Sequence, residues 1–157
     1  MSDLLVKLYD LPPLEPALSA IQKKGFQLRR PIAPERAAVL RWVEQQFNER
    51  WASEIAIAFS RPEVRCFIAL NDEGEIVGFA GFDATFRGFF GPTGVDPSFR
   101  GKGIGTALLL RALHAMWENG HAYGIIGASS MDSYYIKAVR ATPIPDSDPG
   151  PYRDMLH

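Results

Sequence analysis

Apolar and polar residues repeat along this chain with two periods, and the period changes near residue 65. Before that point, apolar positions recur every three or four residues and predict helices at 16–24, 34–48 and 51–59, with a strand at 26–31. Residues 4–9 alternate weakly and predict a short strand or an extended arm. From residue 65 the period is two, which predicts strands at 65–70, 75–83 and 85–94, the first two joined by a turn that ends at Gly74.

The period returns to that of a helix over 103–119, where the apolar stripe is Ile104, Leu108, Leu109, Ala112, Leu113 and Met116. The continuous apolar run 123–128 is typical of a strand at the centre of a sheet. A helix at 131–139 and a brief strand at 141–144 follow, and then an irregular tail from residue 145 that is rich in Pro, Asp, Ser and Gly. This order predicts an α/β fold with one mixed sheet and helices on both of its faces.

Composition and charge exclude several classes of protein. A length of 157 residues suits one domain, and a net charge of −1 argues against a nucleic-acid partner. No apolar run reaches the roughly 20 residues of a membrane span, and the N-terminus has no signal-peptide pattern. The single cysteine, Cys66, excludes an internal disulfide, so we expect a cytoplasmic protein. No histidine has the spacing of a metal ligand, and we expect no metal.

The stretch that carries chemistry runs from the end of the strand at 85–94 into the first turns of the helix at 103–119. It contains Gly101, Gly103 and Gly105, with the cations Arg100 and Lys102 beside them. Glycines allow the backbone to approach a ligand closely, and the first N–H groups of a helix have no partner within it. Such a loop favours an anion, most often a phosphate group.

Glycine spacing decides between the phosphate-binding motifs. The dinucleotide fingerprint needs a third glycine where this chain has Thr106, and the P-loop spacing fails because Gly103 follows Lys102. The remaining pattern, R-x-x-G-x-G from Arg100 to Gly105, is preceded by Val95-Asp96-Pro97. It resembles the acyl-CoA signature of the GCN5-related N-acetyltransferase (GNAT) superfamily.

That resemblance implies a fold and a division of the chain. The fold would be the acyl-CoA N-acyltransferase fold, with a mostly antiparallel central sheet in which two parallel strands splay apart. Residues 26–157 would form the acetyltransferase domain, and residues 1–25 an accessory segment, for instance an arm that covers a sheet edge.

The resemblance also assigns the cofactor site. Acetyl-CoA would be the cosubstrate, with its pyrophosphate held by Arg100, Gly101, Lys102, Gly103, Ile104, Gly105 and Thr106. The thioester would lie at Gly94 and Val95, where Gly91, Pro92 and Gly94 weaken regular strand pairing.

Two catalytic residues are expected from the same comparison. The segment from Ser133 to Ala141 is similar to the family's F-Y-x-K-x-G-F, and it places Tyr135 at the position whose hydroxyl protonates the leaving thiolate. Ala128 and Arg140 depart from the family's usual Asn and Gly. The base is less specified: Asp83, at the end of a strand, is preferred over Asp96 and Glu54.

The function expected from the resemblance is transfer of an acetyl group to a primary amine by direct attack in a ternary complex. The alternative is an acyl-CoA-binding module or regulator without turnover. A polyamine, an aminoglycoside, an amino acid, a peptide N-terminus and a lysine side chain all remain open as acceptors, with a small molecule favoured over a protein. A homodimer through the tail or a sheet edge is a further expectation by family analogy.

Overall fold

A computed structural model describes the whole chain, residues 1–157. Its strands are β1 (Leu4–Lys7), β2 (Gln27–Arg29), β3 (Cys66–Leu70), β4 (Ile76–Phe82), β5 (Phe89–Val95), β6 (Tyr123–Ile126) and β7 (Thr142–Pro143). Its helices are α1 (Glu15–Gln22), α2 (Arg36–Gln46), α3 (Glu49–Phe59), α4 (Ile104–Glu118) and α5 (Asp132–Val139). The tail ends in a 3-10 turn at Gly150–Tyr152, and no helix is long and apolar enough to span a bilayer.

All seven strands form one sheet in the order β2-β3-β4-β5-β6-β1-β7. Every neighbouring pair is antiparallel except β5 and β6, which are parallel. The predicted fold, a mostly antiparallel mixed sheet with one parallel pair, is therefore confirmed. The N-terminal strand β1 lies inside the sheet, between β6 and β7, where it buries Leu4 and Val6.

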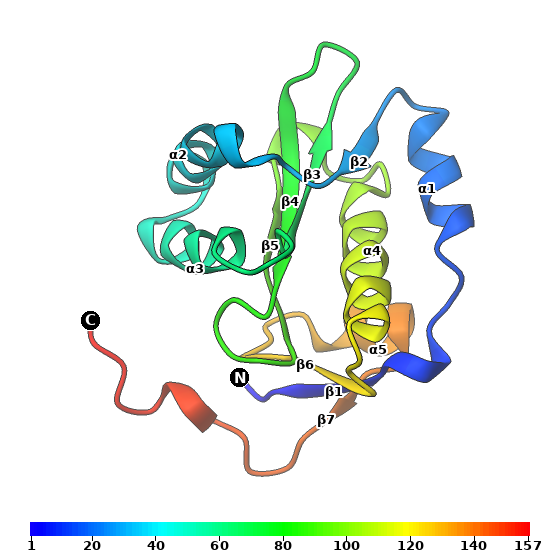
Figure 1. The fold of residues 1–157 in the computed structure, drawn as a ribbon. Helices are drawn as coiled ribbons and strands as arrows, with labels where there is room; N and C mark the ends of the chain where they lie inside the picture. Colours follow the sequence, from blue (N-terminus) through cyan, green and yellow to red (C-terminus); the bar gives the residue numbers. More distant parts are fainter.

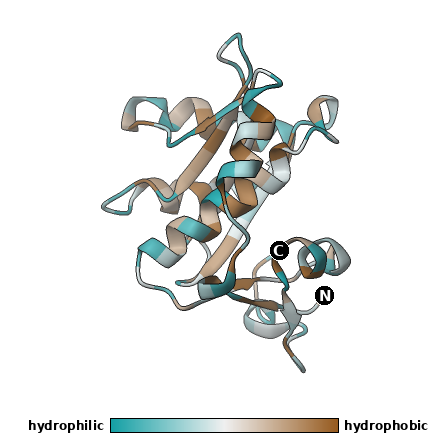
Figure 2. Cartoon of the chain, turned by 90° about the vertical axis from the view of Figure 1, so that its right-hand side faces the viewer, coloured by the Kyte–Doolittle hydropathy of each residue, from teal (hydrophilic) through white to brown (hydrophobic).

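Helices cover both faces of the sheet (Figure 1). Helices α2 and α3 pack on one face, and α1, α4 and α5 lie on the other. Apolar residues concentrate in the central strands, whereas hydrophilic residues occupy the outer loops (Figure 2). The tail passes from β7 toward the side that carries α2 and α3 (Figure 1).

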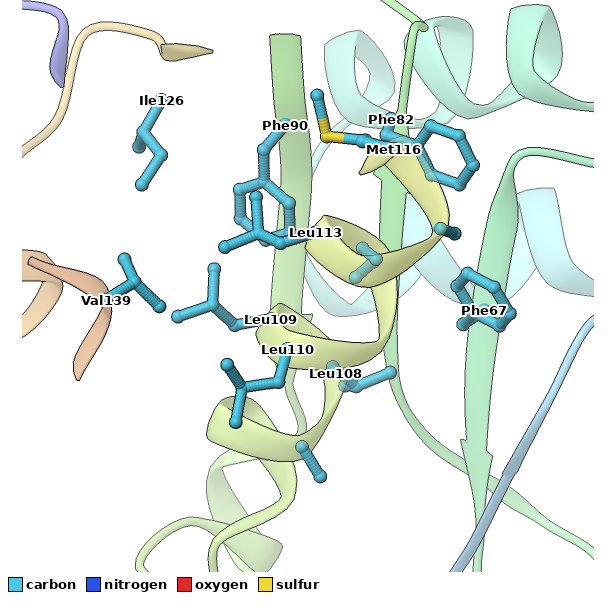
Figure 3. Close-up of a cluster of buried hydrophobic side chains, with 14 of the residues drawn as sticks. Phe67, Phe82, Phe90, Leu108, Leu109, Leu110, Leu113, Met116, Ile126 and Val139 are labelled. Carbon is cyan, nitrogen blue, oxygen red and sulfur yellow. The ribbon is translucent and has the colours of Figure 1, made fainter. Parts of the chain in front are cut away.

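The larger of the two apolar clusters joins α4 to the sheet. Leu109 and Leu113 of α4 approach Phe90 and Ile126, one from each parallel strand, and Val139 closes the cluster from α5 (Figure 3). All six residues of the predicted α4 stripe are buried. Because α4 packs across both parallel strands, it fixes the position of the loop at its own N-terminus relative to the sheet.

Several strands are shorter than predicted, and for two of them the local cause is a residue with a positive φ. The strand predicted at 85–94 begins at Phe89, because Asp83 takes a positive φ of 52° and its carboxylate accepts a hydrogen bond from the Gly88 N–H, which makes 83–88 a turn. Strand β6 ends at Ile126 rather than 128, because Ala128 has a φ of 45° and its N–H donates to Asp3.

Candidate acyl-CoA site

The glycine-rich loop presents a run of free backbone donors at the start of α4. Gly101 and Gly103 have φ angles of 79° and 89°, a region that other residues adopt at a cost. No N–H from Gly101 to Thr106 donates a hydrogen bond within the chain, and the first such bond of α4 runs from the Ala107 N–H to the Gly103 carbonyl. Six consecutive N–H groups at a helix N-terminus suit an anion such as a pyrophosphate.

Side chains around this loop are partly committed to other partners. Arg100 donates through Nε to the Val95 carbonyl at 3.3 Å, so its guanidinium lies along the end of β5. Lys24 of the segment after α1 donates to the Lys102 carbonyl at 3.0 Å. The Lys102 ammonium itself forms no ion pair in the chain. The local charge is therefore positive, as a phosphate ligand requires.

The parallel strands β5 and β6 separate after two residue pairs. Phe89 pairs with Ile125 and Phe90 with Ile126, and no later residue of β5 pairs with β6. On its other side β5 continues to pair with β4 as far as Val95. The stretch 91–95 therefore leaves the edge facing β6 without a strand, and this edge leads directly to the glycine-rich loop.

Gly94 has a packing role at this edge in addition to any ligand role. A Cβ at Gly94 would meet the Phe47 ring, whose Cε1 lies 2.7 Å from that point. Phe47 also packs against Trp42, Trp51 and Phe79, so it has little room to move. The α2–α3 face thus needs glycine at position 94 for its own packing.

The two tyrosines of α5 have different surroundings. The Tyr134 hydroxyl shares a 2.7 Å hydrogen bond with Thr106 Oγ1, in the first turn of α4, and burial raises the pKa of this phenol. Tyr135 is buried in the core, its hydroxyl forms no hydrogen bond in the chain, and burial raises its pKa to about 12. The Tyr134–Thr106 contact was not foreseen from the sequence, because it joins residues 28 positions apart on two helices.

The residue that ends α5 suggests a second alignment of this helix with the family segment F-Y-x-K-x-G-F. Arg140 ends the helix with a φ of 56°, the conformation that favours glycine. Counting back from Arg140 as the glycine of F-Y-x-K-x-G-F places Tyr135 at the phenylalanine position and the exposed Ile136 at the tyrosine position. The role of Tyr135 as the acid stays a prediction.

An open cavity of about 540 Å³ borders Tyr134 at the N-terminus of α5. Its other lining residues come from the two chain segments that follow β6 and precede β1: Met1, Ser2, Ser129, Ser130, Met131, Asp132 and Ser133. The cavity therefore lies beyond the C-terminal end of β6, between the start of the chain and the N-terminus of α5. Tyr134 is the lining residue that joins it to Thr106 of α4.

Asp83 is fully buried and its carboxylate is engaged on every side. Arg65 donates to Oδ2 in a close ion pair, the Gly88 N–H donates to Oδ1 at 2.6 Å, and Nε2 of His121 lies 3.2 Å from Oδ2. Its carbonyl accepts from Arg61. This arrangement holds the turn that starts β5, at the end of the sheet opposite the glycine-rich loop. The prediction that Asp83 is the base stays untested, and these contacts favour a positioning role for its carboxylate instead.

The other two carboxylates considered as bases differ in their surroundings. Asp96 caps a 3-10 turn by accepting from the Ser98 N–H at 2.9 Å. Glu54 is half-buried on α3, accepts a hydrogen bond from the Thr85 hydroxyl, and has its pKa raised mainly by burial. No group of three or more His, Cys, Asp or Glu side chains is placed to hold a metal ion.

Comparison with known proteins places this geometry in a family. The family model described as "Acetyltransferase (GNAT) family" matches residues 28–134. No curated protein matches the sequence. Among solved structures, the fold is similar to a GCN5-related glucosamine N-acetyltransferase region of a fungal multi-domain GH3 beta-N-acetylglucosaminidase, with a TM-score of 0.75 and 14% identity. That match covers 91% of this chain and 19% of the other.

Two bacterial structures give the same result. The fold is similar to a GCN5-related N-acetyltransferase from Sphaerobacter thermophilus, with a TM-score of 0.67 and 22% identity over 91% of this chain and 48% of that one. It is also similar to a GNAT family N-acetyltransferase from Escherichia coli in complex with CoA, with a TM-score of 0.50 and 20% identity over 61% of this chain and 58% of that one. At these identities the likeness establishes the fold, and the chain spans less than half the length of the first two proteins.

Proposed function

The chain belongs to the GNAT acetyltransferase family, and from this premise we propose that it transfers an acetyl group from acetyl-CoA to a primary amine. The amine attacks the acetyl carbonyl directly in a ternary complex. A C–N bond forms and the C–S bond breaks, so that a protonated amine and acetyl-CoA give an amide, the CoA thiol and one proton. The acceptor must therefore lose protons, and the leaving sulfur must gain one.

The observation that carries this proposal is the run of six free N–H groups beside the unpaired edge of β5. The N–H groups from Gly101 to Thr106 would hold the pyrophosphate, with Lys102 nearby as a counter-charge. The amide groups of the coenzyme A arm would pair with the free backbone edge of residues 91–95, in the way that an added β-strand pairs with a sheet. When bound, acetyl-CoA supplies an acyl group already activated as a thioester.

Two tyrosines of α5 are proposed to act on the cofactor, one by protonating the leaving thiolate and one by orienting a phosphate contact. The Tyr135 hydroxyl has no partner in the chain, so it is free to donate its proton to the thiolate sulfur. Its pKa of about 12 keeps it protonated at neutral pH until that transfer. Tyr134 orients Thr106 at the phosphate end through their shared hydrogen bond. Asp83 is assigned a positioning role, because its buried carboxylate holds the turn before β5.

The test combines acetyl-CoA calorimetry with thiol titration during incubation with primary amines. Wild-type protein is expected to bind acetyl-CoA and to release free thiol only when an amine acceptor is present. Gly105→Glu should abolish binding, because it places a carboxylate among the phosphate donors. It should leave the fold intact, since acidic residues favour the first turn of a helix. Absence of acetyl-CoA binding by the wild type would refute the proposal.

Gly105→Ala is the matched control for the added side chain. Gly105 has no positive φ, and a Cβ there meets only Val95 Cγ2 at an ordinary 3.7 Å. The alanine variant should therefore fold normally and bind acetyl-CoA more tightly than Gly105→Glu does. Equal loss in both variants would show that crowding, rather than charge, controls the site.

One observation favours a second candidate function, an acyl-CoA-binding module or regulator without turnover. Alignment from Arg140 leaves Ile136 where the family has its tyrosine. Tight acetyl-CoA binding, no thiol release with any amine, and no effect of Tyr135→Phe would support this alternative.

A further inference from the structure

The C-terminal tail places one aromatic side chain at the point where β5 and β6 separate. The Tyr152 hydroxyl occupies the position that a Cβ on Gly127 would need, and Cδ2 and Cε2 of Phe89 lie 3.1 Å from the same point. Gly127 directly follows β6, and Phe89 begins β5. Tyr152 also meets Phe86 edge to face at 6.3 Å between ring centroids. Two aromatic rings and a phenol therefore surround the start of the splayed edge.

The tail is fastened to this position at several points. The Met1 ammonium pairs with Asp148 at 2.7 Å, and the Asp3 N–H donates to Ser147 Oγ at 2.8 Å. The Asp3 carbonyl accepts from the Ile144 N–H, and its carboxylate accepts from the Ala128 N–H, both at 2.8 Å. Asp3 is itself buried and thus ties the tail to Ala128, the residue after Gly127. These contacts hold Tyr152 in a fixed position against the end of β6.

A carboxylate on α3 lies beside this aromatic cluster. Glu54 accepts a hydrogen bond from the hydroxyl of Thr85, the residue before Phe86, and the Phe86 ring packs against Tyr152. Burial, and then the charges of Asp3 and Glu54, raise the pKa of the Tyr152 phenol to about 12. Glu54 forms no ion pair in the chain, and Arg50, one helical turn earlier, is the cation nearest to it along the helix. Its carboxylate is therefore available to a cationic ligand.

We propose that Tyr152 and Glu54, with the rings of Phe86 and Phe89, form the acceptor side of the site and select a small cationic amine that carries an aromatic or aliphatic tail. This inference rests on the proposed acetyl transfer. Aromatic faces and a half-buried carboxylate together attract an ammonium group, and Phe86 is 42% exposed and available to an apolar tail. Glu54 accepts the proton that the ammonium loses before its nitrogen attacks.

The proposed acceptor side and the glycine-rich loop lie at opposite ends of the free edge of β5. The glycine-rich loop lies beyond the C-terminal end of β5, whereas Tyr152 and Phe89 meet at Gly127, where β5 begins to leave β6. Glu54 joins this cluster through its hydrogen bond with Thr85. A cofactor laid along the free edge from the loop would point its far end toward this cluster, which places the thioester nearer the start of β5 than the predicted Gly94 and Val95. The amine would then approach from the side of α3 and the C-terminal tail. Acetyl-CoA would enter from the side of the glycine-rich loop, so that neither ligand blocks the other.

The experiment uses the full chain and four variants. Tyr152→Phe and Glu54→Gln remove the proposed contacts, while Tyr123→Phe and Glu49→Gln are matched controls at exposed positions, the latter on the same helix as Glu54. Phenethylamine and tryptamine are the probes, and phenethyl alcohol replaces the ammonium with a neutral group. Acetyl-CoA affinity is measured by calorimetry for every protein, and amine binding by thermal shift in the presence of CoA.

We expect both amines to raise the melting temperature of the wild type and to be acetylated, whereas phenethyl alcohol does neither. Tyr152→Phe and Glu54→Gln should each weaken amine binding by roughly tenfold, the effect of one charge-assisted contact. Acetyl-CoA affinity and both control variants should be unchanged. If neither amine binds the wild type, or if the variants bind amines as the wild type does, the inference is wrong. Loss of acetyl-CoA binding in the wild type would instead refute the proposed function.

Discussion

Replacing Asp83 with asparagine separates a structural role of this carboxylate from a catalytic one. The asparagine side chain would keep an oxygen for the Gly88 N–H, and its backbone would tolerate the positive φ of 52°, because Asn adopts that region more readily than most residues. The substitution would remove the charge that pairs with Arg65 and would turn an amide NH₂ toward the guanidinium. The Arg65 charge would then be left without its partner.

The cost can be worked from this pair. Removing one partner of a buried ion pair destabilises a protein by about 3–5 kcal/mol. Asp83 is fully buried, but the Arg65 side chain is 24% exposed and regains some hydration, so we take the lower end, about 3 kcal/mol. For a domain of this size the melting temperature should fall by roughly 6–12 °C.

The assay is urea unfolding together with steady-state kinetics at a temperature where all variants are folded. Asp83→Asn should be destabilised yet keep kcat within about threefold of the wild type, because the carboxylate positions a turn and moves no proton. Asp96→Asn is the control, since Asn caps a helix as well as Asp does. The double variant Asp83→Asn/Arg65→Met should recover part of the lost stability. A stable Asp83→Asn protein with a kcat reduced about a hundredfold would refute this reasoning.

Three further predictions address the tyrosines, the glycine at the strand edge and the cysteine. Tyr135→Phe should lower kcat by roughly a hundredfold without changing acetyl-CoA affinity, whereas Tyr134→Phe should weaken acetyl-CoA binding severalfold at unchanged kcat, through loss of one hydrogen bond. Kinetics and calorimetry decide this, and the reverse pattern would exchange the two roles. Gly94→Ala should lower the free energy of unfolding in urea by about 1–3 kcal/mol by overpacking, and Phe47→Leu should restore part of it. Equal stability of Gly94→Ala and wild type would contradict the packing argument. Cys66 should resist a thiol reagent in the folded protein at mildly alkaline pH and react once guanidinium unfolds it, because burial raises its pKa to about 12. Rapid labelling of the folded protein would show that the thiol is accessible.

The sequence predicted more of the fold than of the candidate site. The two periods predicted each helix and most strands. A helix or strand that packs against the core buries one apolar face, and that face appears in the sequence as a regular spacing of apolar residues. The Gly101–Gly105 spacing predicted the loop for a local reason, since positive φ and free N–H groups are properties of a few consecutive residues. What failed locally was the start of β5, where Asp83 bonds to Gly88 and makes a turn within an alternating pattern.

The acceptor side could not have been found in this way. Asp3 contacts the residue after Gly127 and Tyr152 contacts Gly127 itself, while Glu54 reaches the cluster through Thr85. These residues come from the N-terminus, an irregular tail and a helix, and no periodicity links them. The tail itself was predicted only as irregular. Its position depends on Asp3 and Ser147, which are joined by one hydrogen bond across 144 positions of sequence. Such contacts become visible only when the whole chain is folded.

We propose that the free N–H groups at the start of α4 hold an acyl-CoA. The most direct measurement is titration of ¹⁵N-labelled protein with CoA, followed by amide chemical shifts in two-dimensional NMR spectra. We predict that the largest shifts fall on the amides from Gly101 to Thr106, with a second group over 91–95 on the free edge of β5. Saturating CoA that leaves these amides unshifted, or that shifts a different surface, would contradict the claim.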